Sequence, residues 1–193
     1  MLQKQRLDQA LGLLAQFLAD SKYSAHIIIC GGAALSIMEV VSRPTKDVDV
    51  LALIGDGGRL TDAKPLPEAI QDAANRVAET LGLPLGWLND GPASQIRFGF
   101  PIGMQDRLVP RRYGDFLTVY LIGRLDQIHL KLFAAADQGR GRHTDDLLAL
   151  QPTEEEIEIA ARWVAGQDAS EVFAELLKDM LAQLGYTNVA SRL

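Results

Sequence analysis

Residues 30–53 read CGGAALSIMEVVSRPTKDVDVLAL and contain the features that decide the predicted fold. A glycine pair, Gly31 and Gly32, ends an apolar run, and further along two carboxylates, Asp47 and Asp49, are separated by one apolar residue. Residues two positions apart in a strand leave the same face, so we expect both carboxylates on one face of a sheet. Two oxygen ligands on a rigid face suit Mg²⁺, which binds one or two protein carboxylates together with phosphate oxygens and water.

The composition is that of a folded protein without strong basic character. The chain has 193 residues, of which 48% are hydrophobic and 23% charged, and its net charge is -6. This length allows one full-sized domain, or one domain with a small helical addition. The negative charge argues against a protein that binds nucleic acid over its whole surface, because such binding depends on Lys and Arg.

Hydrophobic periodicity predicts an α+β fold. We expect helices over 2–20, 33–41, 67–81 and 124–136, and strands over 26–30, 47–54 and 116–122. Residues 55–66 have the composition of a loop, 87–104 give no clear pattern, and 137–144 form a polar turn. Two or three helices follow from 145, and Thr153 with Glu156 has the capping-box spacing that starts one of them. We therefore expect a sheet flanked by helices over 1–123 and a helical C-terminal portion over 124–193, packed on this core.

The single cysteine and the N-terminal segment indicate the cellular compartment. Cys30 lies in an apolar run and is expected to be a small buried residue, so a disulfide framework and a Cys-rich zinc site are excluded. Residues 1–20 have the pattern of an amphipathic helix rather than of a signal peptide. No stretch approaches the ~20 apolar residues of a membrane-spanning helix. We expect a cytoplasmic protein without a membrane partner.

The glycine pair and the two carboxylates allow two interpretations. In the functional one, glycine lets backbone N–H groups approach a phosphate while the carboxylates hold a metal ion. In the other, the glycines form a tight turn and the carboxylates pair with Arg43 and Lys46. The apolar strand around Asp47 and Asp49 favours the functional interpretation, because an unpaired carboxylate in such surroundings is costly.

The order of these residues resembles the signature of the nucleotidyltransferase superfamily related to DNA polymerase beta. Within it, the run SRPTKDVDVL at 42–51 resembles the AbiEii-type and MenT-type toxin nucleotidyltransferases and related small bacterial proteins. The resemblance implies a nucleotidyltransferase-like mixed sheet on which Asp47 and Asp49 hold Mg²⁺. The residues that it assigns to nucleotide binding in this segment are Gly31, Gly32, Arg43 and Thr45.

A second segment, IHLKLFAAADQGRGRHTDDLLAL at 128–150, resembles that group's helix with a functional lysine and the Asp-Leu-x-x-Leu pattern that follows it. The resemblance implies that Lys131 contacts the triphosphate and that Asp146 orients Lys131 or accepts a proton, with Asp145 as the adjacent alternative. Taken without the resemblance, Lys131 is equally well a lysine that snorkels from an apolar helix. The two aspartates are then acids at the N-terminus of the next helix.

The implied activity is the Mg²⁺-dependent transfer of an NMP from an NTP to a hydroxyl of an RNA, such as a tRNA, or of a protein. The catalytic residues would be Asp47, Asp49, Lys131 and Asp146. Such a chain is a candidate toxin of a toxin–antitoxin pair, with a cognate antitoxin as its partner. The alternative is a catalytically inactive protein that uses the same fold to bind a nucleotide, an RNA or a partner protein.

Three weaker features complete the prediction. Asp115, just before the strand at 116–122, is a candidate for the third strand carboxylate that is common in the broader superfamily. The alternative is a side chain that caps the turn, so Asp115 is not assigned to the site. Two basic clusters suit phosphate but are more typical of solvated surface; they are Arg107, Arg111 and Arg112, and Arg140, Arg142 and His143. The three histidines share no metal-ligand spacing.

Overall fold

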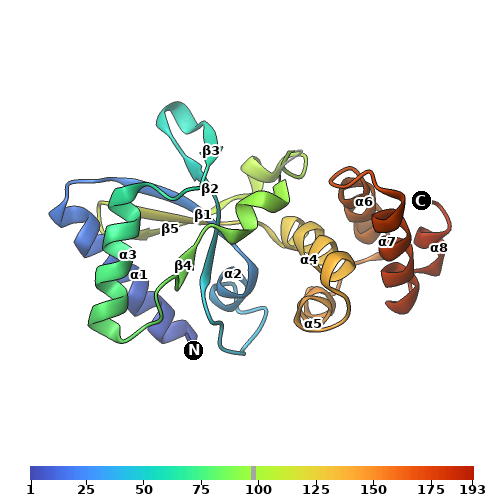
Figure 1. The fold of residues 1–193 in the computed structure, drawn as a ribbon, viewed down its shortest axis with the longest axis horizontal. Helices are drawn as coiled ribbons and strands as arrows, with labels where there is room; N and C mark the ends of the chain where they lie inside the picture. Colours follow the sequence, from blue (N-terminus) through green and yellow to red (C-terminus); the bar gives the residue numbers. More distant parts are fainter. Residues whose placement is uncertain (97–98) are drawn as a thin grey trace. The chain divides into compact units, whose positions relative to one another are not determined.

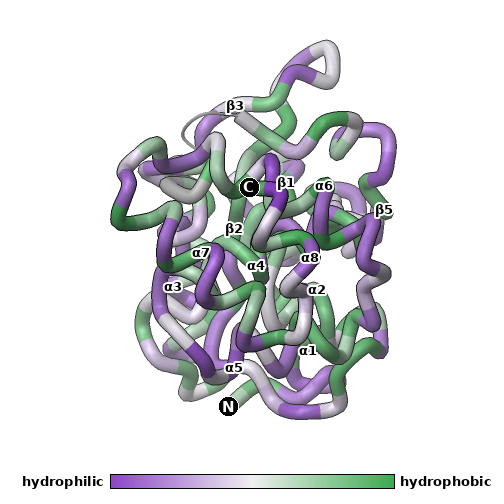
Figure 2. The backbone as a smooth tube through the Cα atoms, turned by 90° about the vertical axis from the view of Figure 1, so that its right-hand side faces the viewer, coloured by the Kyte–Doolittle hydropathy of each residue, from purple (hydrophilic) through white to green (hydrophobic). Residues whose placement is uncertain are grey.

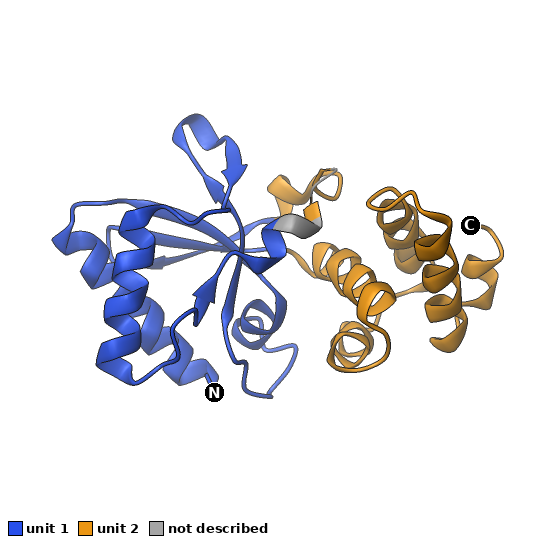
Figure 3. Cartoon of the chain, in the orientation of Figure 1, with its two compact units in different colours: residues 1–94, 108–122 blue, residues 95–107, 123–193 orange. Residues whose placement is uncertain are grey.

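The computed structural model describes residues 1–96 and 99–193 and has an α+β fold, as predicted. The chain divides into two compact units (Figure 3). Unit 1 comprises residues 1–94 and 108–122, and unit 2 comprises 95–107 and 123–193. The strands of the described residues belong to unit 1, whereas unit 2 is helical.

Unit 1 is built on a six-stranded sheet with the order β3-β2-β1-β6-β5, and β4 pairs with β2 beside this path. The strands are β1 (Ala25–Cys30), β2 (Val48–Ile54), β3 (Leu60–Asp62), β4 (Leu88–Asn89), β5 (Val109–Tyr113) and β6 (Leu117–Leu121). β1 runs antiparallel to β2 and parallel to β6, while β4 runs parallel to β2. β1 therefore lies at the centre of the mixed sheet, between β2 and β6, and its last residue pairs with the start of β2.

Helices α1 (Lys4–Asp20), α2 (Gly31–Ile37) and α3 (Glu68–Leu81) belong to the same unit, and α1 and α3 lie side by side (Figure 1). Their apolar residues share one buried cluster with alternate residues of the central strands, among them Ile27, Ile29, Val48 and Val50. Removal of this apolar surface from water stabilises the unit. Trp87 joins the cluster and donates its indole N–H to the carbonyl oxygen of Ala74 at 2.9 Å.

A bulge between β1 and β2 determines which face each side chain of β2 occupies. Ile28 pairs with Ala52 and Ile29 with Val50, so Leu51 is the additional residue of β2. The bulge keeps Val50 in the helix-covered cluster. Because side chains alternate along a strand, Asp49, which pairs with Cys30, lies on the face opposite this cluster.

Unit 2 contains α4 (Arg124–Gln138), α5 (Arg142–Ala149), α6 (Glu154–Ala165), α7 (Glu171–Gln183) and α8 (Thr187–Ala190). α4 packs against α5, α6 and α7, so it is the central helix of the unit. Its buried positions include four polar residues, namely Asp126, Gln127, His129 and Lys131. No helix of the described residues is long and apolar enough to cross a membrane.

The predicted elements are largely confirmed, and the differences concern short or exposed segments. The stretch 55–66 contains the short strand β3, which the loop prediction missed, and the tube between β2 and β3 is purple to near-white in Figure 2. The second helix begins at Gly31 and ends at Ile37, earlier than predicted, and α5 begins at Arg142 within the predicted turn. The exposed strand β5 was not predicted. Within 87–104, which gave no clear pattern, residues 97 and 98 lie outside the described residues.

Candidate functional site in each unit

In unit 1 the backbone of the turn from β1 into α2 lies close to polar side chains of the segment that leads into β2. Gly31 has a φ of +69°, a left-handed conformation that glycine adopts readily. A Cβ at Gly31 would lie 2.7 Å from Oδ2 of Asp49, and a Cβ at Gly32 would lie 2.9 Å from Oγ1 of Thr45. Real Cβ atoms do not approach so closely, so a side chain at either glycine would force Asp49 or Thr45 to move.

The two carboxylates lie where the sequence predicts them. Asp47 immediately precedes β2 and Asp49 is its second residue; both are partly buried, and Val48 between them is fully buried in the core. Asp49 additionally accepts a hydrogen bond from Nδ2 of Asn89 at 3.2 Å. The alternation within β2 places Asp49 on the face opposite the helices, and Asp47 directly precedes the strand.

Thr45 fixes the chain that leads to these carboxylates. Its backbone exchanges two hydrogen bonds with Leu2, of 2.7 and 2.9 Å, and its hydroxyl donates to the carbonyl oxygen of Asp47 at 3.1 Å. Arg43 also reaches the turn, since its Nη1 lies 3.9 Å from the position of a Cβ at Gly32. Gly31, Gly32, Arg43, Thr45 and Asp49 are therefore brought together, as the resemblance implies.

The donor set of this turn fits a hard divalent cation that is shared with a ligand. The described residues contain no group of three or more His, Cys, Asp or Glu side chains that could hold a metal on their own. Mg²⁺ usually binds to one or two carboxylates and completes its shell with phosphate oxygens and water. Asp47 and Asp49 supply that number of carboxylates.

Asp115 is not a third carboxylate of this site. It is exposed in the turn between β5 and β6, and Leu117 just after it pairs with Ala25 at the start of β1. Asp49 pairs with Cys30 at the other end of β1. At about 3.3 Å per residue, the length of β1 separates the two carboxylates. The sequence alone left Asp115 open, because the parallel pairing of β1 with β6 could not be read from it.

In unit 2, Lys131 and Asp146 form a buried ion pair. Nζ of Lys131 lies 2.8 Å from Oδ2 of Asp146, and the two residues are 4% and 1% exposed. Lys131 does not snorkel to the solvent, so that alternative is wrong. Asp145, in contrast, is exposed in the first turn of α5, where an acid interacts favourably with the helix dipole. The geometry thus selects Asp146 rather than Asp145 as the partner of the lysine.

The start of α5 positions Asp146. The hydroxyl of Thr144, which is buried, accepts a hydrogen bond from the N–H of Gly141 at 3.1 Å and donates to the Gly141 carbonyl oxygen at 2.6 Å. This local contact fixes the first turn of the helix, which begins at Arg142, four residues before Asp146. The ion pair therefore joins α4 to a helix whose first turn is fixed by its own side chain.

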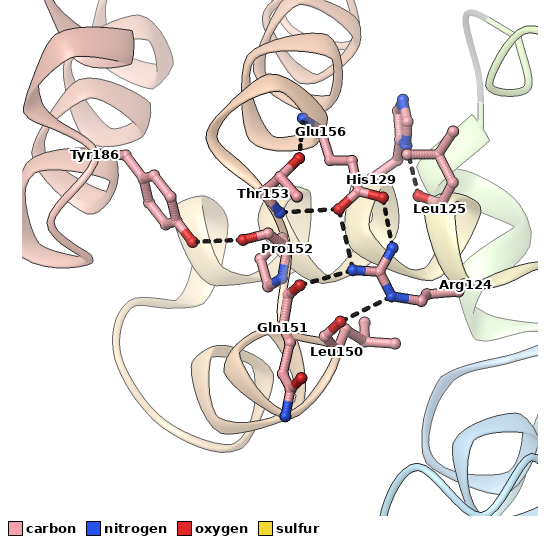
Figure 4. Close-up of polar contacts among 9 residues, drawn as sticks. All are labelled: Arg124, Leu125, His129, Leu150, Gln151, Pro152, Thr153, Glu156 and Tyr186. Atoms are coloured by element: carbon pink, nitrogen blue, oxygen red, sulfur yellow. Dashed lines mark hydrogen bonds and ion pairs between the residues drawn. The ribbon is translucent and has the colours of Figure 1, made fainter.

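Arg124 connects the first turn of α4 to the segment that leads into α6 (Figure 4). It donates to the carbonyl oxygens of Leu150 and Gln151 at 2.8 and 2.7 Å, and it binds both carboxylate oxygens of Glu156. Hydrogen bonding by Arg124 lowers the pKa of Glu156 below its usual value. Glu156 also completes the predicted capping box with Thr153. These contacts fix how α4 and α6 meet within unit 2.

A second arginine, Arg107, connects the segment 95–107 of unit 2 to α4. Arg107 contacts both carboxylate oxygens of the fully buried Asp126, from Nε at 3.1 Å and from Nη2 at 2.5 Å. Hydrogen bonding by Asp126 raises the pKa of Arg107. In the first predicted basic cluster, Arg107 is thus a structural residue. Arg111 forms an ion pair with Asp8, in which Nη1 lies 3.6 Å from Oδ1. Arg112 is exposed, as are Arg140 and Arg142 of the second cluster, while Nε2 of His143 lies 3.1 Å from Oε1 of Gln138.

At the candidate site of unit 1, Asn89 is the residue that the sequence analysis missed. It belongs to the two-residue strand β4 and pairs with Asp49 across the sheet. A strand so short has no periodicity to detect. The only local signal was the Asn-Asp-Gly run at 89–91, which is typical of a turn.

The comparison with known protein families agrees with the sequence resemblance and defines the class as nucleotidyl transferase. The family described as nucleotidyl transferase AbiEii toxin, of type IV toxin–antitoxin systems, matches residues 12–184. The chain therefore belongs to this family. No curated protein and no solved structure gave a match.

Proposed function

We propose that the chain transfers an NMP from an NTP to an acceptor hydroxyl with Mg²⁺ held by Asp47 and Asp49. The observation that supports this proposal most strongly is the close approach of Asp49 to Gly31 at the end of β1, where a Cβ would lie 2.7 Å from the carboxylate. Bound Mg²⁺ would supply charge neutralisation at the phosphates and lower the barrier to displacement of pyrophosphate. The family's description as a nucleotidyl transferase is consistent with this reaction.

The residues of unit 1 would bind and orient the nucleotide. Asp47 and Asp49 would hold the metal from one face of β2. The absence of side chains at Gly31 and Gly32 would let the backbone approach the triphosphate. Arg43 would contribute a guanidinium suited to phosphate oxygens, and Thr45 would keep the segment before Asp47 in place.

Lys131 would contribute positive charge to the triphosphate, a role that rests on the resemblance of its helix to the family. Within unit 2 its position is fixed by Asp146, which supports an orienting role for this carboxylate. Nζ of Lys131 is 2.8 Å from Oδ2 of Asp146, so one oxygen of Asp146 is already engaged in an ion pair with the lysine. We therefore propose Asp146 as a positioning residue rather than as the base that takes the acceptor's proton.

As a member of a toxin family of type IV toxin–antitoxin systems, the protein is proposed to act as a toxin with a cognate antitoxin. The proposed acceptor is the hydroxyl of an RNA such as a tRNA, or of a protein. We expect the protein to function in the cytoplasm.

The direct test is transfer of label from nucleotides carrying ³²P on the α-phosphate. The purified protein is incubated with Mg²⁺ and each of the four NTPs, once with total RNA and once with total protein, and Asp47→Ala serves as the inactive control. We expect Mg²⁺-dependent labelling of one acceptor class that is lost in the control. Failure to bind nucleotide or to label either acceptor would contradict the proposal.

The same preparation separates the catalytic function from the binding alternative. A catalytically inactive binding protein would retain nucleotide affinity after both Asp47 and Asp49 are replaced by Ala. We expect the double variant to lose Mg²⁺-dependent nucleotide binding while its circular dichroism spectrum and melting temperature stay close to those of the wild type. Retained binding in that variant would favour the inactive alternative.

A further inference from the structure

Asn89 makes two hydrogen bonds that together fix its side chain. Its Nδ2 donates to Oδ1 of Asp49 at 3.2 Å, and its Oδ1 accepts from the N–H of Gly91 at 2.9 Å. An amide oxygen only accepts, so the Gly91 N–H determines which end of the amide faces Asp49. The donor end is therefore directed at the carboxylate by the backbone of the turn that follows β4.

The main chain supports the same contact. β4 runs parallel to β2, and Asn89 and Asp49 are register partners. Gly91 gives the amide its space, because a Cβ there would lie 3.0 Å from Oδ1 of Asn89. Sheet pairing, the turn and the side-chain hydrogen bonds thus place the amide beside the carboxylate consistently.

The two oxygens of Asp49 have different surroundings. Oδ1 accepts from Asn89, while Oδ2 is directed at Gly31. Because rotation of the carboxylate out of this plane would break the bond to Asn89, the amide fixes the plane of the carboxylate and so holds its second oxygen against the Gly31 turn.

We propose that Asn89 is a positioning residue that sets the orientation of Asp49 for divalent metal and nucleotide. This inference rests on the metal-binding role proposed for Asp49 above. The amide acts without adding charge, which keeps the number of carboxylates at two. A carboxylate at the same position would accept from Gly91 equally well, but it would place a further negative charge against Asp49.

Two substitutions separate positioning from support of the turn. Asn89→Ala removes both hydrogen bonds. Asn89→Asp keeps an acceptor for the Gly91 N–H, loses the donor to Asp49 and adds a carboxylate. Asp90→Ala is the matched control, because the Asp90 carboxylate accepts from the N–H of Leu66 at 3.2 Å and its loss disturbs the same segment.

The experiment measures binding of a non-hydrolysable NTP analogue by the full-length protein as Mg²⁺ is raised, together with the melting temperature of each variant. We expect Asn89→Ala to raise the half-saturating Mg²⁺ concentration about fivefold, since a hydrogen bond to a charged group is lost. Asn89→Asp should lower it below the wild-type value, because a third carboxylate strengthens the attraction for a cation. Asp90→Ala should leave the half-saturating concentration unchanged even where the melting temperature falls.

Two results would overturn the inference while leaving the proposed function intact. In one, the wild type responds to Mg²⁺ and Asn89→Ala responds identically. In the other, both Asn89 variants and Asp90→Ala shift together in proportion to their loss of stability, which indicates a purely structural role. A folded wild-type protein without any Mg²⁺-dependent binding would instead contradict the proposed function, and the role of Asn89 would fall with it.

Discussion

The two candidate sites use charged residues in opposite ways. In unit 1, Asp47 and Asp49 are partly buried, and Asp49 lies beside Gly31, which leaves no side chain between backbone and carboxylate. In unit 2, Lys131 and Asp146 are almost completely buried and neutralise each other. Charges of the first kind suit a ligand, whereas the burial of the second kind is offset mainly by the mutual attraction of the pair. Substitutions in unit 1 should therefore affect function with little effect on stability, whereas substitutions of the ion pair in unit 2 should affect stability as well.

The largest expected effect is on activity in unit 1. Asp47→Ala or Asp49→Asn should reduce nucleotidyl transfer about a thousandfold or more, because loss of a metal ligand removes several kcal/mol of transition-state stabilisation. The melting temperature should change little, since both carboxylates lie outside the apolar core. Initial rates of label transfer and thermal unfolding measure the two quantities. Asp56→Asn, an exposed acid of the β2–β3 connection, should retain full activity.

In unit 2 the expected effect includes a loss of stability. Lys131→Met leaves the Asp146 carboxylate buried without its cation and should cost about 3 kcal/mol of stability, as expected for a broken buried ion pair. Chemical denaturation measures this loss. The double variant Lys131→Met, Asp146→Leu should recover most of the stability because no buried charge remains. If the single variant is as stable as the wild type, the pair does not contribute in the way its burial implies.

The double variant also tests the catalytic role of the pair. A folded double variant that remains fully active would contradict the role proposed for Lys131 while leaving the energetic argument intact. Recovery of stability without recovery of activity would support both.

A smaller effect is expected where the backbone approaches the carboxylate. Gly31 and Gly57 have the same φ of +69°, but only Gly31 has a side chain near its Cβ position. Gly57→Ala should cost about 1 kcal/mol for the left-handed conformation alone. Gly31→Ala should cost more, because Asp49 must also move, and it should weaken Mg²⁺-dependent nucleotide binding. Equal melting temperatures and unchanged nucleotide affinity in the two variants would contradict the close contact.

The parts of the fold that the sequence predicts are those determined by local pattern. The helices at 67–81 and 124–136 have periodic apolar faces, and the capping box at Thr153 begins α6 as expected. β5 escaped prediction because its sequence, VPRRY, forms an exposed edge strand with arginines and a proline instead of an alternating apolar pattern. β3 escaped because three residues are too few to show a period.

The residues of the candidate sites likewise divide into those that local pattern predicts and those that only tertiary packing reveals. Gly31, Asp47 and Asp49 can be selected from one continuous segment because turn chemistry and strand alternation are local. Asn89 cannot, because its contact with Asp49 depends on pairing between segments 40 positions apart. The burial of Lys131 likewise becomes visible only when α5 packs against α4.

The smallest expected effect concerns the pH dependence of stability in unit 2. His129 lies on α4 with Nδ1 2.7 Å from the carbonyl oxygen of Leu125 and its ring edge-on to Trp163. Burial lowers the pKa of His129 below 6.5 and is the largest cause of the shift. The hydrogen bond to Leu125 and the charge of Asp126 raise this pKa by smaller amounts, and the charge of Arg107 lowers it slightly further. As the pH falls below 6.5, the unfolded chain therefore takes up a proton that the folded protein resists. The free energy of unfolding should fall slightly over this range.

The measurement is denaturant unfolding of the wild type and of His129→Phe at pH 8 and at steps below pH 6.5. Phe keeps an aromatic ring against Trp163 but cannot titrate. Any loss of packing or of the Leu125 contact shifts the stability of the variant equally at every pH, whereas loss of titration changes only the slope. We expect the difference in stability between the two proteins to move in favour of His129→Phe as the pH falls. A difference that stays constant with pH would show that His129 does not contribute to the acid sensitivity of the folded protein.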